Sequence, residues 1–161
     1  MAALDYFLKI DGIEGESRDS KHKGEIELES WSWGETQAVL ASGGGGGAGK
    51  VQMQDFHFVT RVSKASPKLF LACASGQHVK SAQLTARKAG ERQLEFLRYT
   101  LSDVLVTSYQ TGGSGAEEVV PMDQVSLNFS KIQVDYTEQK PDGSAGGTLS
   151  AGWDVKTNKK A

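Results

Sequence analysis

Apolar residues alternate with polar residues along most of this chain, in short runs that end at clusters of glycine, aspartate and serine. Because successive side chains of a β-strand point to opposite faces, such alternation predicts strands with one buried face. The pattern predicts strands near residues 4–10, 25–33, 51–62, 79–88, 92–101, 103–110, 122–137 and 150–157. Strands at this spacing indicate an all-β sandwich or barrel.

The alternation changes parity inside three of these runs, between residues 28 and 31, 53 and 56, and 129 and 132. A β-bulge reverses the inward face in this way and lets a sheet curl into a barrel. Alternatively, one strand crosses from one sheet to another at such a point. Both interpretations favour a closed or nearly closed structure, which we predict to be a β-barrel of two curled, mainly antiparallel sheets.

One short helix is expected beside the barrel, near residues 66–76. Ser66 suits the N-cap, Pro67 suits the first helical position, and Gly76 suits a left-handed C-cap. Leu69, Ala72 and Cys73 would share one face, with Phe70 flanking it. A helix this short needs to pack on the barrel wall to be stable.

The chain has 161 residues and shows no repeat and no second domain, so residues 1–161 are expected to form a single domain. Most of its 19 glycines lie in three segments, near 41–50, 111–118 and 140–148, which we expect to be flexible loops.

Charge and cysteine content argue against several functions. With 20 acidic and 18 basic residues, the net charge is −2, which gives nucleic-acid binding little electrostatic support. Cys73 is the only cysteine, so neither an intrachain disulfide nor a thiolate metal cluster is expected. The N-terminal residues lack the pattern of a cleaved signal, and no apolar run is long enough to span a bilayer. We therefore expect no membrane insertion.

No pattern predicts a cofactor, a metal or a catalytic centre. Residues 44–50 match the start of a phosphate-binding loop, but Val51 replaces the hydroxyl residue that such a loop needs, and a strand follows. His22, His57 and His78 have no partner at ligand spacing. The acidic run at 15–29 is interpreted as a solvated loop followed by an outward strand face. We therefore do not expect an enzyme.

Several segments resemble a known family when taken together and in order. They are GESRDSKH, EIELESWSWG, GGGGGAGKVQMQDFHF, SPKLFLACASGQH, AQLTARKAG, VLVTS, TGGSG, VSLNF and GWDVKTN. This series is similar to the haemolysin-coregulated protein (Hcp) family of bacterial type VI secretion, over nearly the whole chain. Departures are local, at Ala65 and in the loop 117–121.

The resemblance implies a barrel with one flanking helix that assembles as a hexameric ring. Stacked rings would form the inner tube of a contractile machine with sheath, spike and baseplate proteins as partners. Contraction would expel the tube with effectors in its lumen. The protein would be cytoplasmic during assembly and then secreted to the medium or a target cell without a cleaved signal. Because no toxin domain follows, a structural carrier of effectors is expected.

The resemblance and the alternation together suggest roles for three groups of residues. Trp31, Trp33, Phe56 and Phe58 are expected in the barrel core. Ser30 and Ser32 point the opposite way, and we expect them to line the lumen, although a solvated outer face gives the same pattern. A ring-stacking loop is expected at Gly43, Gly44, Gly45, Gly46, Gly47, Ala48, Gly49 and Lys50, with Lys50 as a polar anchor; a merely disordered loop is the alternative.

Two other functions stay open from the sequence. A small-ligand-binding β-barrel would need a wide apolar mouth and an interior cavity. A hydrolase would need a convergent triad.

Overall fold

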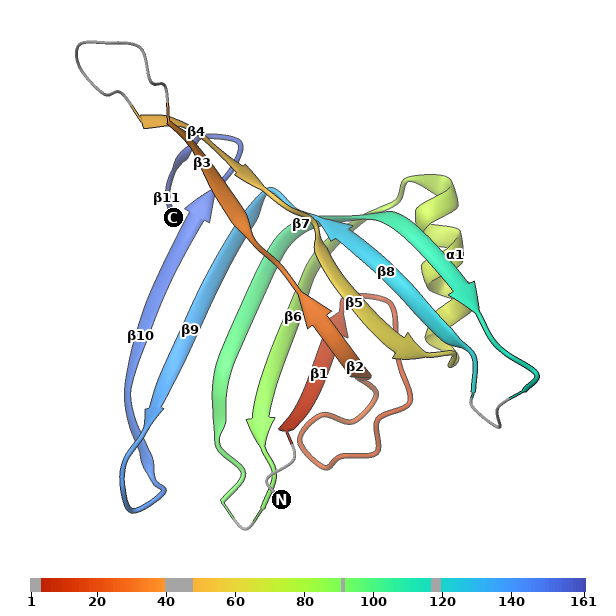
Figure 1. The fold of residues 1–161 in the computed structure, drawn as a ribbon, viewed down its shortest axis with the longest axis horizontal. Helices are drawn as coiled ribbons and strands as arrows, with labels where there is room; N and C mark the ends of the chain where they lie inside the picture. Colours follow the sequence, from red (N-terminus) through yellow and green to blue (C-terminus); the bar gives the residue numbers. More distant parts are fainter. Residues whose placement is uncertain (1–3, 40–47, 91, 117–119) are drawn as a thin grey trace.

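The computed structural model describes residues 4–39, 48–90, 92–116 and 120–161 (Figure 1). In chain order, its elements are β1 (Leu4–Ile10), β2 (Ile26–Ser32), β3 (Glu35–Val39), β4 (Ala48–Met53), β5 (Phe56–Arg61), α1 (Ala65–Ser75), β6 (His78–Lys88), β7 (Glu95–Gly112), β8 (Met122–Asn128), β9 (Lys131–Gln139), β10 (Ala145–Asp154) and β11 (Lys159–Lys160).

Nine of the strands in the described residues form one antiparallel sheet that closes on itself. Their order is β11-β10-β9-β7-β6-β1-β2-β5-β8, and β8 also pairs with β7. The strands from β7 through β6, β1, β2 and β5 to β8 therefore make a closed barrel, and β9, β10 and β11 extend the sheet beyond it. The prediction of an all-β barrel with one flanking helix is confirmed.

Strand β7 gives the barrel both its closure and its extension. Residues 97–102 of β7 pair with β9, whereas residues 105–112 pair with β8. Asp103 lies between these halves with a φ of 54°, a value at which the chain departs from regular strand geometry. The two strands expected at 92–101 and 103–110 are thus one long strand that changes partner at its middle.

The three parity changes have two different structural causes. In β2 the pairing with β5 shifts register between Leu28 and Ser30, which is the irregularity expected of a bulge. The other two changes mark passages between strands: β4 ends at Met53 before β5 begins at Phe56, and β8 gives way to β9 at residues 129–130. The alternation did not reveal β3, which pairs with β4 in a separate two-stranded sheet.

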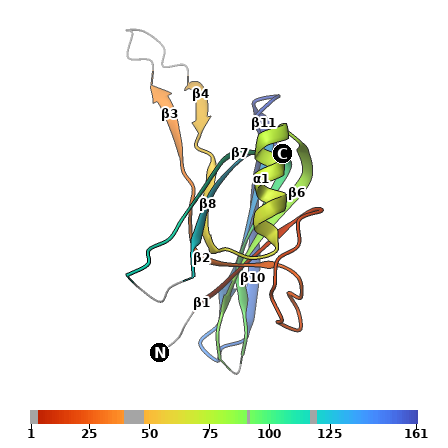
Figure 2. The ribbon, with the colours of Figure 1, turned by 90° about the vertical axis from the view of Figure 1, so that its right-hand side faces the viewer.

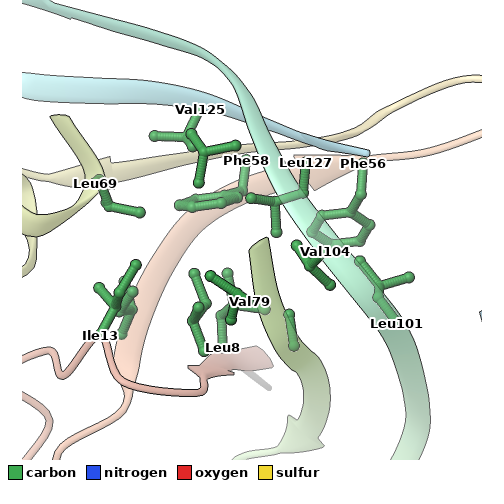
Figure 3. Packing of buried hydrophobic residues seen from close by; sticks show 14 of the residues in the cluster. Leu8, Ile13, Phe56, Phe58, Leu69, Val79, Leu101, Val104, Val125 and Leu127 are labelled. Atoms are coloured by element: carbon green, nitrogen blue, oxygen red, sulfur yellow. The ribbon is translucent and has the colours of Figure 1, made fainter. Parts of the chain in front are cut away.

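The barrel interior is filled by apolar side chains from most of its strands (Figure 3). Phe56 and Phe58 are fully buried, as are Val125 and Leu127 on the neighbouring strand β8. Leu69 of α1 points into the same cluster, so the helix closes one side of it. Burying a side chain of this size contributes about 1.5–3 kcal/mol to folding.

Helix α1 runs from Ala65 to Ser75 along one face of the barrel (Figure 2). The expectation that Ser66 is the N-cap is wrong: Lys64 occupies that position, without a side-chain cap. Ser66 lies inside the first turn because its hydroxyl is used in a buried contact with β8. Gly76 ends the helix with a φ of 66°, as the C-cap prediction required. Cys73 is partly buried and packs against the core.

All three segments expected to be flexible are partly regular structure, since residues 48–50 of the first belong to β4. Residues 145–148 belong to β10, and β9 and β10 are joined by a short turn in which Gly143 has a φ of 88°. Thr111 and Gly112 end β7. Backbone pairing between strands explains these corrections, since glycine in a strand keeps its ladder hydrogen bonds.

The acidic run at 15–29 is less solvated than expected. His22 is buried, and its ring nitrogens lie 2.9 Å from Glu25 and 2.6 Å from Glu95. Asp19 accepts hydrogen bonds from both terminal nitrogens of buried Arg87. Two charges on β6 and β7 therefore hold this segment against the barrel, a contact between residues far apart in sequence.

Candidate functional site

One outer face of the barrel carries small polar side chains. The register of β2, β5, β8 and the second half of β7 places Ser32, His57, Ser126 and Ser108 in one row, and Ser30, Val59, Gln124 and Gln110 in the next. Ser30, Ser32, Gln124 and Gln110 are exposed, and the others are half-buried. We call these two rows the polar face.

The bulge in β2 explains why Ser30 and Ser32 belong to this face. Before the bulge, Ile26 and Leu28 point inward; after it, Trp31 points inward and the serines on either side point out. Trp31 stacks on Phe56 with ring centroids 5.9 Å apart. The structure therefore brings the two predicted serines together on one exposed surface.

The polar face offers hydrogen-bonding groups without strong charge. His57 Nδ1 lies 3.2 Å from Ser126 Oγ. This is the one side-chain hydrogen bond that the described residues give His57, and a hydrolytic triad needs a further group that orients the imidazole. Sequence alternation places His57 on the strand face opposite Phe56 and Phe58, but its position beside Ser32 follows only from the pairing of β2 with β5.

The four expected core residues differ in burial. Phe56 and Phe58 are fully buried, whereas Trp31 and Trp33 are partly buried and pack against the edge of the core. Trp33 packs on Tyr99 and Phe129, at centroid distances of 6.0 and 6.4 Å. The tryptophans lie where the barrel opens toward β9 and β10, and this position explains their remaining exposure.

Part of the expected stacking loop belongs to a projecting hairpin. Strands β3 and β4 continue β2 and β5 away from the barrel (Figure 1). Ala48, Gly49 and Lys50 belong to β4 rather than to a loop, because they continue the ladder with β3. Gly43, Gly44, Gly45, Gly46 and Gly47 lie outside the described residues. A Cβ at Gly49 would come within 2.5 Å of the Ala38 carbonyl oxygen, so glycine is required there.

The described residues contain no group of three or more histidine, cysteine or acidic side chains placed to hold a metal ion. His78 contacts Asp103, and Lys156 contacts the same carboxylate. Both hydrogen bonds lower the pKa of Asp103 below its ordinary value, and the bond from Lys156 has the larger effect. Val51 lies in β4, so a strand rather than a helix follows the glycine-rich segment.

An apolar groove of about 560 Å³ lies between the hairpin and the sheet extension. Its lining includes Trp33 and Met53 from one side and Tyr99, Val134 and Trp153 from the other. The groove is outside the closed barrel, whose own interior is filled by side chains.

The fold thus defines a class of protein: a closed antiparallel barrel with one flanking helix, a projecting hairpin and an exposed polar face. A family model described as "Type VI secretion system effector, Hcp" matches residues 7–136. Protein hcp1 of Pseudomonas aeruginosa is 51% identical over 162 residues, covering 99% of this chain and 99% of that protein.

Solved structures agree with this result. Hcp1 from Salmonella typhimurium is 40% identical, covers 100% of both chains and superposes with a TM-score of 0.81. A type VI secretion system effector from Yersinia pestis is 36% identical, with a TM-score of 0.76, over 94% of this chain and 100% of that one. A further type six secretion system protein is 30% identical, with a TM-score of 0.94, over 99% and 100% of the two chains.

This chain therefore belongs to the Hcp family, and it is a type VI secretion tube protein. Within the described ranges, no helix has the length and apolarity needed to cross a membrane.

Proposed function

We propose that copies of this chain, each folded as a single domain over residues 1–161, assemble into six-membered rings that stack into the inner tube of a type VI secretion machine. The observation that carries the proposal is the polar face, which lies on four strands and has no covering element among the described residues. In a ring, six such faces would line the lumen. Small uncharged side chains leave room for cargo and supply hydrogen bonds to it.

Effectors are the proposed cargo, with Ser30 and Ser32 in contact with them. Both serines are exposed, and His57 and Gln124 beside them add hydrogen-bonding groups. A surface with few charges binds different polar partners weakly, which suits a carrier that has to release its load.

The hairpin is the proposed contact between stacked rings. It projects from the barrel (Figure 1), and Lys50, an exposed residue of β4, would meet a polar group of the next ring. Residues 43–47 would extend this contact. Weak contacts repeated six times around a ring would hold a tube that can still come apart after firing.

Sheath, spike and baseplate proteins are the proposed partners outside the tube, and nucleic acid and membrane are not. The role is structural rather than enzymatic. Assembly would take place in the cytoplasm, and contraction of the sheath would then carry the protein out without a cleaved signal.

The test is negative-stain electron microscopy of the purified, untagged protein, with class averages sorted by symmetry. Open rings with sixfold symmetry are expected. Monodisperse monomers at high concentration would contradict the proposal and favour a barrel that binds a small ligand in the groove beneath the hairpin.

A further inference from the structure

His57 is the one ionisable side chain in the two rows of the polar face. The other members of these rows are serines, glutamines and a valine, none of which carries a charge. Histidine is the side chain that ordinarily gains or loses its charge between about pH 5 and 8. The charge of the two rows is therefore set by a single imidazole.

Ser126 can hold the His57 ring in both protonation states. His57 Nδ1 lies 3.2 Å from Ser126 Oγ, and a hydroxyl donates to a bare ring nitrogen or accepts from an N–H. Protonation therefore leaves this contact intact, and the side chain has no need to move. The second nitrogen, Nε2, has no partner among the described residues and is not one of their buried unpartnered polar atoms, so it is open to solvent.

One end of the polar face carries the carboxylate of Asp55, two residues before His57. The Thr107 hydroxyl donates to one of its oxygens at 2.6 Å, and the Asn128 amide donates to the other at 3.0 Å. Both oxygens are thus engaged by neutral donors from β7 and β8. Within the described ranges, no hydrogen bond or ion pair joins Asp55 to His57.

At the other end, the charges belong to β2 and to the last residue of β5. Arg61 Nε lies 2.9 Å from Glu29 Oε1, and Glu27 is exposed further along β2. The outward residues that β8 and the second half of β7 contribute to the two rows are all uncharged. Carboxylate and guanidinium groups ordinarily keep their charge above about pH 5.5. Protonation of His57 is therefore what changes the charge at the middle of the face.

We infer that His57 determines which cargo the polar face accepts, and that its protonated form selects acidic cargo surfaces. The inference rests on the proposed function and deepens it, because in a six-membered ring six copies of His57 would face the lumen. Charges on the wall of a channel reinforce one another, since protein screens them less than water does. A protonated Nε2–H would donate a charge-assisted hydrogen bond to a carboxylate, and the same six charges would repel lysine and arginine.

Polyaspartate and polylysine of matched length, each with a fluorescent label, are the probes for this inference. Fluorescence anisotropy would measure their binding to purified rings at about pH 7.5 and about pH 5.5, at one ionic strength. His57→Gln is the test variant, because a glutamine amide can still bond Ser126 but cannot take up a proton. His57→Lys carries a positive charge at both pH values. His78→Gln is the matched control, since His78 contacts Asp103 and lies outside the polar face.

Rings of the wild type and of His78→Gln should bind polyaspartate at least about tenfold more tightly at the lower pH, the gain expected when one hydrogen bond becomes charge-assisted. Polylysine should bind the same rings more weakly at the lower pH. His57→Gln should lose both effects. His57→Lys should bind polyaspartate tightly at either pH.

Negative-stain microscopy of every sample at both pH values separates this inference from the proposed function. A wild type without rings would overturn the proposed function and the inference with it. Wild-type rings that bind polyaspartate equally at both pH values would overturn the inference alone. So would His57→Gln rings that keep the gain, or His78→Gln rings that lose it, because the change in charge would then lie elsewhere.

Discussion

The hydroxyl of Ser66, in the first turn of α1, donates a hydrogen bond to the fully buried carboxylate of Asp123 on β8. The Tyr109 hydroxyl donates to the other oxygen of the same carboxylate at 2.9 Å. Burial, and then this contact with Asp123, raises the pKa of Tyr109. One acidic side chain therefore joins the helix to the two strands that close the barrel.

Replacing Asp123 with alanine should destabilise the fold by about 2–4 kcal/mol, because two hydroxyl groups lose their acceptor inside the protein. Urea unfolding followed by circular dichroism, at fixed subunit concentration, would measure the loss. Gln124→Ala is the control on the same strand, with an expected change within about 0.5 kcal/mol. In a double-mutant cycle with Ser66→Ala, the double mutant should lose less stability than the sum of the losses in the two single mutants. Equal stability of Asp123→Ala and wild type would contradict this assignment.

The pair of Asp19 and Arg87 should make stability fall in acid. The Arg87 guanidinium donates two hydrogen bonds to the Asp19 carboxylate and holds the pKa of Asp19 well below its ordinary value. As the pH falls, the Asp19 carboxylate therefore takes up a proton in the unfolded chain before it does so in the folded chain. The stabilisation is complete above the unfolded pKa of about 3.9 and is lost as pH falls toward the folded pKa.

Asp19→Asn tests this prediction. At pH 7 the variant should be less stable than wild type by about 1–3 kcal/mol, because a hydrogen bond to a charged group is weakened. The difference between the two proteins should shrink as the pH falls below about 4. Unfolding in urea at several pH values would measure it, with Glu14→Gln as an exposed control. A difference that stays constant down to the acid limit would rule out the proposed linkage.

Alternation along the chain was enough to predict the barrel and most strands, because a half-buried strand has apolar residues at every second position. The alternation did not predict β3, since its side chains from Glu35 to Ala38 are all exposed and no buried face distinguishes them. Contacts between residues far apart in the chain could not be predicted from local sequence patterns either. The local sequence suits Ser66 as an N-cap, but its hydroxyl donates a hydrogen bond to the buried carboxylate of Asp123, 57 residues away.

Only part of the polar face could be predicted from the sequence, for the same reason. The parity change after Leu28 placed Ser30 and Ser32 on one face, and the bulge that produces it is local. The rest of the polar face depends on pairing between β5, β8 and β7. Those pairings follow from the closure of the barrel, so His57 and Gln124 could be placed beside the serines only in three dimensions.

Gly49→Ala should distort the hairpin while leaving the barrel intact. An added Cβ would lie 2.5 Å from the Ala38 carbonyl oxygen, so the pairing of β3 with β4 has to shift. Amide hydrogen exchange at Gln37 and Val51 should become faster, and exchange at Phe58 should not change. Gly112→Ala is the matched control, because a Cβ there meets nothing within 4 Å. Unchanged exchange in β3 and β4 would contradict the steric argument. If the hairpin joins stacked rings, Gly49→Ala should also shorten tubes.

Ser32→Gln tests the polar face as the lumen. Ser32 is exposed and lies in register with His57, so a longer side chain would project from the face without entering the core. Rings should form as in wild type, whereas effector binding should weaken by about tenfold, which corresponds to about 1.4 kcal/mol. Co-purification of an effector with the rings would measure the loss. Ser20→Gln is the control, because Ser20 is exposed outside the polar face. A Ser32→Gln protein that retains and exports its cargo as well as wild type would show that this face does not line the lumen.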